Sequence, residues 1–247
     1  MDFALSEDQL ELKQAAHAWL ADRFPLDRDW EAPDDRWSEL QELGWLDVAE
    51  AGLGFVEEAL LLEEMGYVCY PGFYLGRVAS LSGDGDTATV DPTRPAWRVE
   101  DETPRFRAAA AAEALGVAQR ALDLGVEHAK TREQFGKPIG TYQAVSHPLA
   151  QTYTDVELAR SLVYWAAWCV AEDDDRAPRA AAAAKAFATE AAVVACERSI
   201  QVHGGIGFTW EHPLHRFYKR ALWLEGFGRR PAELRLEIAD ALLSGGE

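Results

Sequence analysis

A short stretch of the sequence, TREQFGK at residues 131–137, holds side chains that are suited to binding a nucleotide. The guanidinium of Arg132 presents a planar fork of donors that fits a pyrophosphate. Gln134 offers an amide that can pair with the edge of a base, and Phe135 can stack on a ring or fill the core. A structural turn is the alternative, because a basic residue near a helix C-terminus also interacts well with the helix dipole.

A second stretch, QVHGGIGF at residues 201–208, can bring backbone amides close to an anionic ligand. Gly204 and Gly205 carry no side chain, so a ligand can approach their N–H groups closely. The structural alternative is a C-cap, because many helices end on a glycine in the left-handed conformation.

Other kinds of site find little support in the sequence. None of the six histidines follows a glutamate by three residues, as a di-iron helix bundle requires. His212 and His215 form a lone HxxH, for which a solvated or hydrogen-bonded pair is a better interpretation than a zinc site, so we expect no metal. Cys69, Cys169 and Cys196 lack CxxC spacing and predict buried reduced thiols. GxSxG and GKS/GKT runs are absent, which argues against ordinary hydrolase and kinase chemistry.

The elements that must position these residues are predicted to be helices. Residues 1–80 predict a small N-terminal helical domain, with Ser6 as an N-cap and later helices that end at Gly44 and Gly66. Residues 105–247 carry long helical patterns with short connections, which predict a C-terminal antiparallel helix bundle. Alanine-rich faces allow its helices to approach closely. The fold class is therefore mainly α.

Residues 81–104 differ from both helical parts, because glycine, proline, threonine and aspartate dominate them. Short strands can form at TATV and AWRV, but the segment is too short for a sheet that stands alone. GDGDTA at 83–88 matches a dinucleotide loop in letters only, since no strand precedes it and a proline soon follows. We expect a vestigial β or loop segment between two helical domains.

The charge of the chain limits its partners. A formal net charge of −18 argues against nucleic acid. Residues 1–104 have a net charge of −17 and residues 105–247 a net charge of −1, so the second part has basic side chains available for an anionic ligand. No apolar run is long enough to span a membrane, and the acidic N-terminus does not have the apolar core of a signal peptide. These features predict a cytoplasmic globular protein.

The sequence resembles the acyl-CoA dehydrogenase family, most closely in AEALGVAQRALDLGVEHAKTREQFGKPIGTYQAV, QVHGGIGFTWEHPLHRFYKRA and WLEGF. The early SEDQ helix, WSELQELGW and LLLEEMGY are similar to the helical entry domain of that family. In relatives, the arginine, glutamine and phenylalanine of such a stretch contact the adenosine diphosphate half of an FAD held mainly by a neighbouring subunit, and the Q-x-H-G-G stretch lies along the same FAD. The cofactor-binding residues that the resemblance implies are Arg132, Gln134, Phe135, Gln201, Gly204 and Gly205.

The resemblance also implies candidates for the family's reaction, in which a carboxylate removes the α-proton of an acyl-CoA thioester while a hydride leaves the β-carbon for the flavin. Glu225, followed by Gly226, falls at one base position of the family, where apolar neighbours would raise its pKa as a general base requires. A structural or solvated role is the alternative for Glu225. Phe106 occupies the other base position and cannot serve, and Arg107 matches an arginine that meets the acyl-CoA.

Family members carry a β-sandwich domain in the place that residues 81–104 occupy here. The chain thus resembles a shortened subunit of the heteromeric (α2β2) actinobacterial acyl-CoA dehydrogenases, several of which act on steroid side-chain thioesters. We expect it to work with a full-length acyl-CoA dehydrogenase partner, FAD, an acyl-CoA substrate and an electron-transfer acceptor. The alternatives are a non-catalytic scaffolding or regulatory subunit and a self-sufficient homo-oligomeric flavoenzyme with a trimmed fold.

Overall fold

The computed structural model describes residues 5–30, 34–48, 52–79 and 102–244. The expected strands TATV and AWRV and the run GDGDTA lie outside these residues. The helices of the N-terminal part are α1 (Glu7–Arg23), α2 (Trp37–Glu42), the 3-10 turn η1 (Trp45–Asp47), α3 (Phe55–Val68) and α4 (Tyr74–Val78). The later elements are α5 (Pro104–Thr131), β1 (Glu133–Gln134), β2 (Lys137–Pro138), η2 (Ile139–Thr141), α6 (Gln143–Ala171), α7 (Ala177–His203), η3 (Gly204–Phe208), α8 (Leu214–Gly226) and α9 (Pro231–Ser244).

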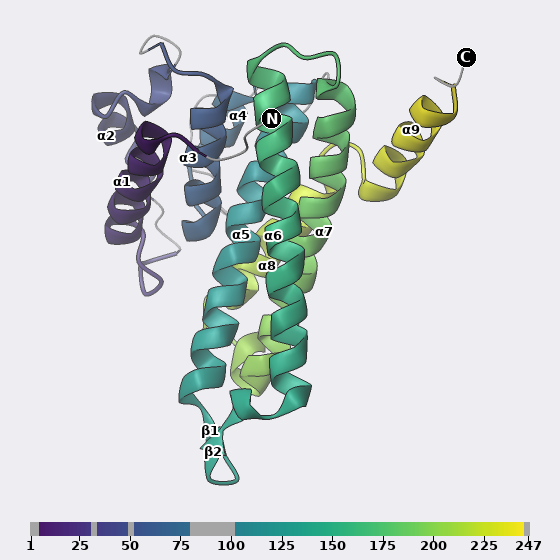
Figure 1. Cartoon of the computed structure of the whole chain (residues 1–247). Coiled ribbons are helices and arrows are strands. Elements are labelled where there is room, and N and C mark those ends of the chain that lie inside the picture. The colour runs from purple at the N-terminus through teal and green to yellow at the C-terminus, as the bar shows by residue number, and fades with distance from the viewer. Residues whose placement is uncertain (1–4, 31–33, 49–51, 80–101, 245–247) are drawn as a thin grey trace.

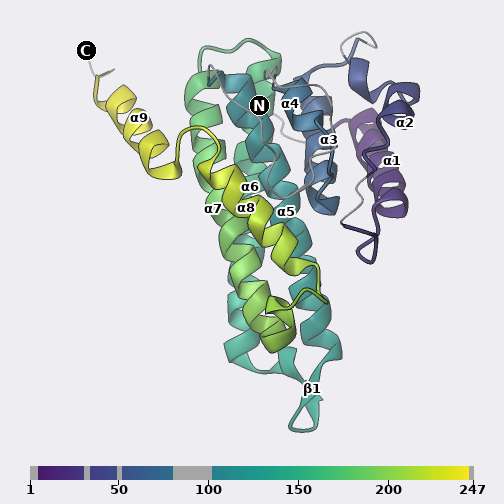
Figure 2. The ribbon, with the colours of Figure 1, turned by 180° about the vertical axis from the view of Figure 1, so that it is seen from behind.

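The predicted mainly α fold is confirmed, and β structure in the described residues is confined to the two-residue strands β1 and β2. Helices α5, α6 and α7 lie side by side as an antiparallel bundle, with α1–α4 along one flank and α9 projecting from the other (Figure 1). Helix α8 runs along the opposite face of the bundle (Figure 2). Among the helices described, none combines the length and the apolar character that a membrane span requires.

Alanine-rich helix faces form much of the bundle core, as the sequence predicts. Every side chain from Ala108 to Ala112 on α5 is fully buried, and so are Ala180, Ala184 and Ala188 on α7. Small side chains let two helix backbones approach closely, so the helices pack densely without large residues between them. The three cysteines are free and buried, as expected for reduced thiols.

The N-terminal helices begin and end at sequence signals, with one exception. The Oγ of Ser6 accepts the N–H of Gln9 at 3.2 Å while the Gln9 side chain accepts the N–H of Ser6 at 3.0 Å, which is a capping box. Gly44 takes a left-handed φ of 73° after α2. The predicted end of α3 at Gly66 is wrong, because the helix continues to Val68 and Cys69 supplies its left-handed cap with φ 51°.

Gly66 lies inside α3 because α3 crosses α5 at this point. A Cβ on Gly66 would collide with the carbonyl oxygen of Glu113, and a Cβ on Gly116 would collide with the carbonyl oxygen of Glu63. Both glycines therefore serve a close helix contact, and the sequence cannot tell this role from a helix stop.

Replacing Gly116 with alanine is expected to lower the free energy of unfolding by about 2–3 kcal/mol, because the added methyl forces the α3 and α5 backbones apart. Urea denaturation followed by circular dichroism measures the loss. Gly226→Ala is the matched control, since a Cβ at Gly226 would meet nothing within 4 Å in the part of the chain that the structure describes. Equal stability of the two variants would show that the helix crossing tolerates a side chain.

Candidate functional site

The stretch between α5 and α6 forms a hydrogen-bonded hairpin. The N–H of Arg132 donates to the carbonyl of His128 at 2.8 Å and so closes the last turn of α5. Phe135 and Gly136 then turn the chain with φ values of 53° and 79°. Positive φ at both central residues is the geometry that matches the twist of a two-residue hairpin. The Tyr142 hydroxyl donates to the carbonyl of Gln134 at 3.1 Å and anchors the hairpin to the start of α6.

The side chains of this hairpin point away from the protein. Phe135 is 92% exposed, so the interpretation that it fills the core is wrong. Its nearest aromatic neighbour is Tyr142, with ring centroids 6.5 Å apart. Arg132 is exposed and forms no ion pair among the described residues. Gln134 is exposed as well, and its amide donates to the adjacent carbonyl of Glu133 at 2.9 Å. A positioned aromatic ring and a guanidinium are thus available to another molecule.

The glycine stretch caps α7 and is also open to solvent. Gly204 adopts φ 65° and its N–H donates to the carbonyls of Ile200 and Gln201, so the C-cap interpretation is correct for its backbone. A Cβ on Gly204 or on Gly205 would meet no atom of the described residues within 4 Å. Gly205 and the side chain of Gln201 are exposed. A ligand can therefore reach the backbone at this turn.

The hairpin and the glycine stretch lie at the same end of the bundle, where α5 and α7 both terminate (Figures 1 and 2). The rings of His128 on α5 and His203 on α7 stack with centroids 4.3 Å apart. Since His128 contacts Arg132 through its carbonyl and His203 directly precedes Gly204, the stack joins the two segments. The structure thus brings the two sequence-predicted cofactor stretches together.

Glu225 lies apart from this end, on the last turn of α8, which runs back along the bundle (Figure 2). Partial burial raises the pKa of its carboxyl, and the charges of Glu190 and Glu197 add to the effect. Arg230 and Lys185 oppose the shift. The direction is the one that a base working near neutral pH requires.

Arg107 is fully engaged within the chain. Its guanidinium is 6% exposed and donates to both carboxylate oxygens of Glu237 on α9, at 2.7 and 3.0 Å. Its Nε donates to Glu102 at 3.2 Å. Phe106 is completely buried, with its ring centroid 5.3 Å from that of Phe227. A thioester would have to displace Glu237 before it could meet Arg107.

Lys185 is a buried cation close to this network that the sequence did not single out. It is fully buried on α7, and its ammonium donates to the carbonyl of Arg229 at 2.6 Å. Burial lowers the pKa of Lys185 to about 8. The available signal was a single lysine within the run AAAAKAFA, on a helix that is otherwise apolar there.

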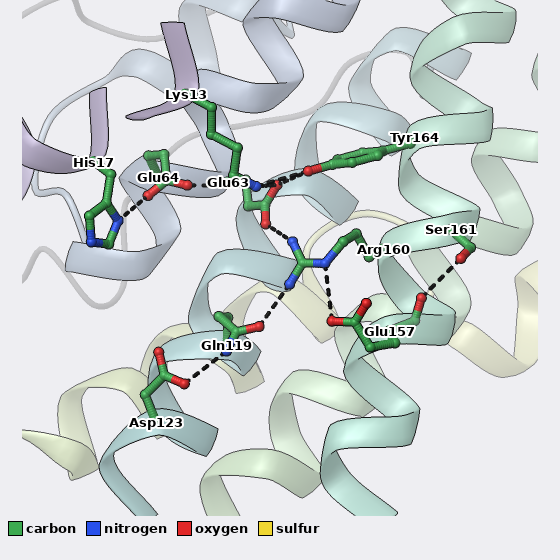
Figure 3. Close-up of polar contacts among 10 residues, drawn as sticks. All are labelled: Lys13, His17, Glu63, Glu64, Gln119, Asp123, Glu157, Arg160, Ser161 and Tyr164. Atoms are coloured by element: carbon green, nitrogen blue, oxygen red, sulfur yellow. Dashed lines mark hydrogen bonds and ion pairs between the residues drawn. The ribbon is translucent and has the colours of Figure 1, made fainter. Parts of the chain in front are cut away.

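A second polar cluster, between the N-terminal helices and the bundle, was also missed (Figure 3). Glu63 and Glu64 on α3 are only 3% and 5% exposed. Lys13 on α1 meets Glu63 at 2.5 Å, and the Tyr164 hydroxyl donates to the same carboxylate at 2.8 Å. Arg160 on α6 pairs with its other oxygen. Glu63, Glu64 and the two cations border a cleft of about 350 Å³. No local sequence pattern separates these glutamates from ordinary surface acids.

Within the described residues, no group of three or more His, Cys, Asp or Glu side chains is placed to hold a metal ion. His212 and His215 belong to a set of aromatic contacts instead. His212 lies 4.5 Å from His203 between ring centroids, and the ring of His215 lies 4.6 Å from that of Trp210.

Comparison with known proteins assigns the two helical parts. Residues 99–240 match the family model "Acyl-CoA dehydrogenase, C-terminal domain", and residues 6–83 match "Acyl-CoA dehydrogenase, N-terminal domain". Acyl-CoA dehydrogenase IpdE2 of Mycobacterium tuberculosis is 43% identical over 145 residues, which cover 54% of this chain and 44% of that protein. The chain thus spans less than half the length of this relative.

Solved structures show the same fold. A chain of the ChsE4-ChsE5 complex from Mycobacterium tuberculosis matches with a TM-score of 0.79 at 22% identity, over 100% of this chain and 100% of that chain. Butyryl-CoA dehydrogenase from Megasphaera elsdenii matches with a TM-score of 0.80 at 19% identity, over 98% of this chain and 100% of that chain. The "Tcur3481-Tcur3483 steroid ACAD G363A variant" matches with a TM-score of 0.78 at 24% identity, over 98% and 99%. With both of its helical parts matched by their family models, the chain belongs to the acyl-CoA dehydrogenase family.

Proposed function

We propose that this chain is one subunit of a hetero-oligomeric, FAD-dependent acyl-CoA dehydrogenase, and that its hairpin end completes an FAD site on a full-length partner subunit. The observation that carries the proposal is Phe135, an aromatic ring that is 92% exposed on a hydrogen-bonded turn. A ring held outward on a hydrogen-bonded turn can stack on an aromatic group of another molecule. Arg132 beside it is an exposed cation without an acidic partner among the described residues.

The residues at this end fit the adenosine diphosphate half of FAD. The Arg132 fork can bind the pyrophosphate, the Phe135 ring can stack on an aromatic group, and the Gln134 amide can pair with a base or ribose. At Gly204 and Gly205 no side chain stands between the backbone and solvent, so a ligand can approach the chain closely there. When bound, FAD supplies the hydride acceptor for α,β-desaturation of an acyl-CoA thioester.

The flavin ring and the thioester are assigned to the partner in this proposal. In the described part of the chain, β structure is limited to two-residue strands, so no sandwich is present there to cradle a ring. Arg107, the candidate for contacting acyl-CoA, is tied to Glu237. Glu225 has the raised pKa of a base but lies away from the hairpin. One candidate acyl group is a steroid side chain, since the Tcur3481-Tcur3483 enzyme is named a steroid acyl-CoA dehydrogenase.

Flavin content tests the proposal directly. The chain is co-expressed with a full-length acyl-CoA dehydrogenase partner, and the purified complex is analysed by visible absorbance and light scattering. We expect a colourless chain to become part of a yellow complex, and Arg132→Ala to weaken FAD retention by about tenfold through loss of a charge-assisted contact. Arg179→Ala, which removes an exposed cation at the opposite end of α7, is the control. Unchanged flavin in the Arg132→Ala complex would refute the assignment.

A non-catalytic scaffolding or regulatory subunit is the second candidate. The observation that favours it is the Arg107–Glu237 pair. Arg107 is the residue proposed to contact the substrate, but its guanidinium already binds the carboxylate of Glu237 in the same chain. A partner subunit that is yellow and fully active by itself, and only more stable in the complex, would decide for this role.

A further inference from the structure

We propose that the contacting rings of His128, His203 and His212, here called the histidine stack, position the hairpin and the glycine stretch relative to each other. Protonation of the histidine stack would then loosen the end of the bundle and release its ligand. The positioning role concerns the chain by itself. Only the identity of the ligand rests on the proposed function above.

The histidine stack joins three separate elements. His203, at the end of α7, lies between His128 on α5 and His212 just before α8. Its ring centroid is 4.3 Å from His128 at an interplanar angle of 26°, and 4.5 Å from His212 at 48°. Two of the three residues adjoin the candidate ligand-binding segments, because the backbone carbonyl of His128 accepts the N–H of Arg132 and His203 directly precedes Gly204. A shift of the middle ring would therefore move both segments.

Hydrogen bonds orient the rings of this end and fix where two of them carry a proton. The Nδ1 of His203 lies 2.8 Å from the carbonyl of Ser199, and the Nδ1 of His215 lies 2.9 Å from the carbonyl of His212. A carbonyl oxygen only accepts, so both nitrogens carry a proton and donate it. His212 differs, because its Nδ1 accepts the N–H of Leu214 at 3.2 Å. Protonating that nitrogen would remove a hydrogen bond at the start of α8.

The charged groups that act on the histidines of this end do not stabilise a protonated ring. None of these histidines pairs with a carboxylate among the described residues. The charged neighbours that act on them are cationic: Arg132 acts on His128 from the end of α5, and Arg216 and Lys219 act on His215 from α8. Backbone hydrogen bonding with His212 and Thr209 favours a proton on His215, but burial outweighs it and lowers the pKa of His215. Unpaired charge in such surroundings is costly.

The titration of His212 gives the direction of the pH effect. Burial, followed by the charges of His203, His128 and His215, lowers the pKa of His212 to about 4. Burial and the charges of His203 and Arg132 also lower the pKa of His128. An unfolded histidine binds its proton near pH 6.5, so the stabilising contribution is complete above that pH and is lost as the pH falls from about 6.5 towards 4.

Hydrogen exchange of the full chain tests the positioning role. The probes are the amides of Arg132, Ile139, Gly204 and Thr209, which are hydrogen-bonded at this end. After correction for intrinsic exchange, we expect their protection in the wild type to fall about tenfold between pH 7.5 and pH 5.5. His203→Ala should show low protection at both pH values, because the middle ring is gone.

His203→Phe separates stacking from titration. A phenyl ring keeps the stack, carries no proton and accepts a neighbouring imidazolium on its face, so protection should fall less than about threefold over the same pH range. His147→Ala is the control, since His147 is an exposed histidine at the start of α6 outside the stack. It should behave as the wild type does. Protection that is independent of pH in the wild type, or unaffected by His203→Ala, would overturn the inference.

Flavin retention in the partner complex then separates this inference from the proposed function. If both hold, FAD is lost below pH 6 in the wild type and retained in His203→Phe. If the exchange results hold while Arg132→Ala leaves flavin unchanged, the histidine stack still positions this end of the bundle, and the ligand is not FAD.

Discussion

Replacing Arg220 with alanine is expected to lower the free energy of unfolding by about 3–5 kcal/mol at pH 8. Arg220 on α8 and Glu113 on α5 are 1% and 2% exposed, and the guanidinium Nε and one terminal nitrogen both lie 2.5 Å from the same carboxylate oxygen. Removing the cation leaves Glu113 charged and buried without compensation. An unpaired charge in the interior destabilises the folded state far more than an exposed one, because the interior cannot solvate it.

The dependence of this loss on pH distinguishes charge from packing. Burial already raises the pKa of Glu113, and Arg220 opposes that shift. Without Arg220 the folded carboxyl should bind a proton more readily than the unfolded one, so the deficit shrinks as the pH is lowered from 8 to 5. Urea denaturation at both pH values measures it. A loss of equal size at pH 8 and pH 5 would indicate that the cavity, and not the charge, dominates.

The paired variant Glu113→Leu with Arg220→Met serves as the control for folding. It removes both charges and keeps comparable volume, so its stability should lie within about 1 kcal/mol of the wild type. A double variant as unstable as Arg220→Ala would mean that the ion pair itself, and not the avoidance of a lone buried charge, stabilises the contact between α5 and α8.

Glu63→Gln is expected to lower the free energy of unfolding by about 3 kcal/mol. One carboxylate oxygen of Glu63 receives Arg160, and the other receives Lys13 and the Tyr164 hydroxyl (Figure 3). An amide has a single oxygen, and its NH2 group would face donors. One of the two cations would therefore lose its acceptor inside the cleft.

Glu157→Gln provides the matched comparison, because it meets the same Arg160. Its carboxylate is 45% exposed and lies 3.3 Å from the guanidinium. Exposed ion pairs contribute little to stability, so we expect Glu157→Gln to change the free energy of unfolding by less than about 0.5 kcal/mol. Hydrogen exchange of α1 should increase in Glu63→Gln and not in Glu157→Gln, since Lys13 ties α1 to this cluster. Equal effects of the two substitutions would contradict this account.

Local sequence signals determined where several helices of this protein begin, end and pack. Ser6 starts α1 through a capping box, Gly44 follows α2 in the left-handed conformation, and the alanine runs of α5 and α7 pack as close helix pairs. Such signals act within a few residues, so the sequence carries them directly. The helical class and the family followed from the same patterns. The placement of Arg132, Gln134 and Phe135 between two long helices was also available from the sequence alone.

Only the tertiary structure decided which side chains are buried, exposed or paired, because these contacts join residues that are far apart in the chain. Gly66 resembles a helix stop, yet it stays helical since α5 passes against it. Phe135 has the side chain of a core residue, but the hairpin turns it outward to 92% exposure. Arg107 is satisfied by Glu237, 130 positions later. His128 and His203 lie 75 positions apart in the sequence, and their rings stack only because α5 and α7 run in the same direction and end together at one end of the bundle.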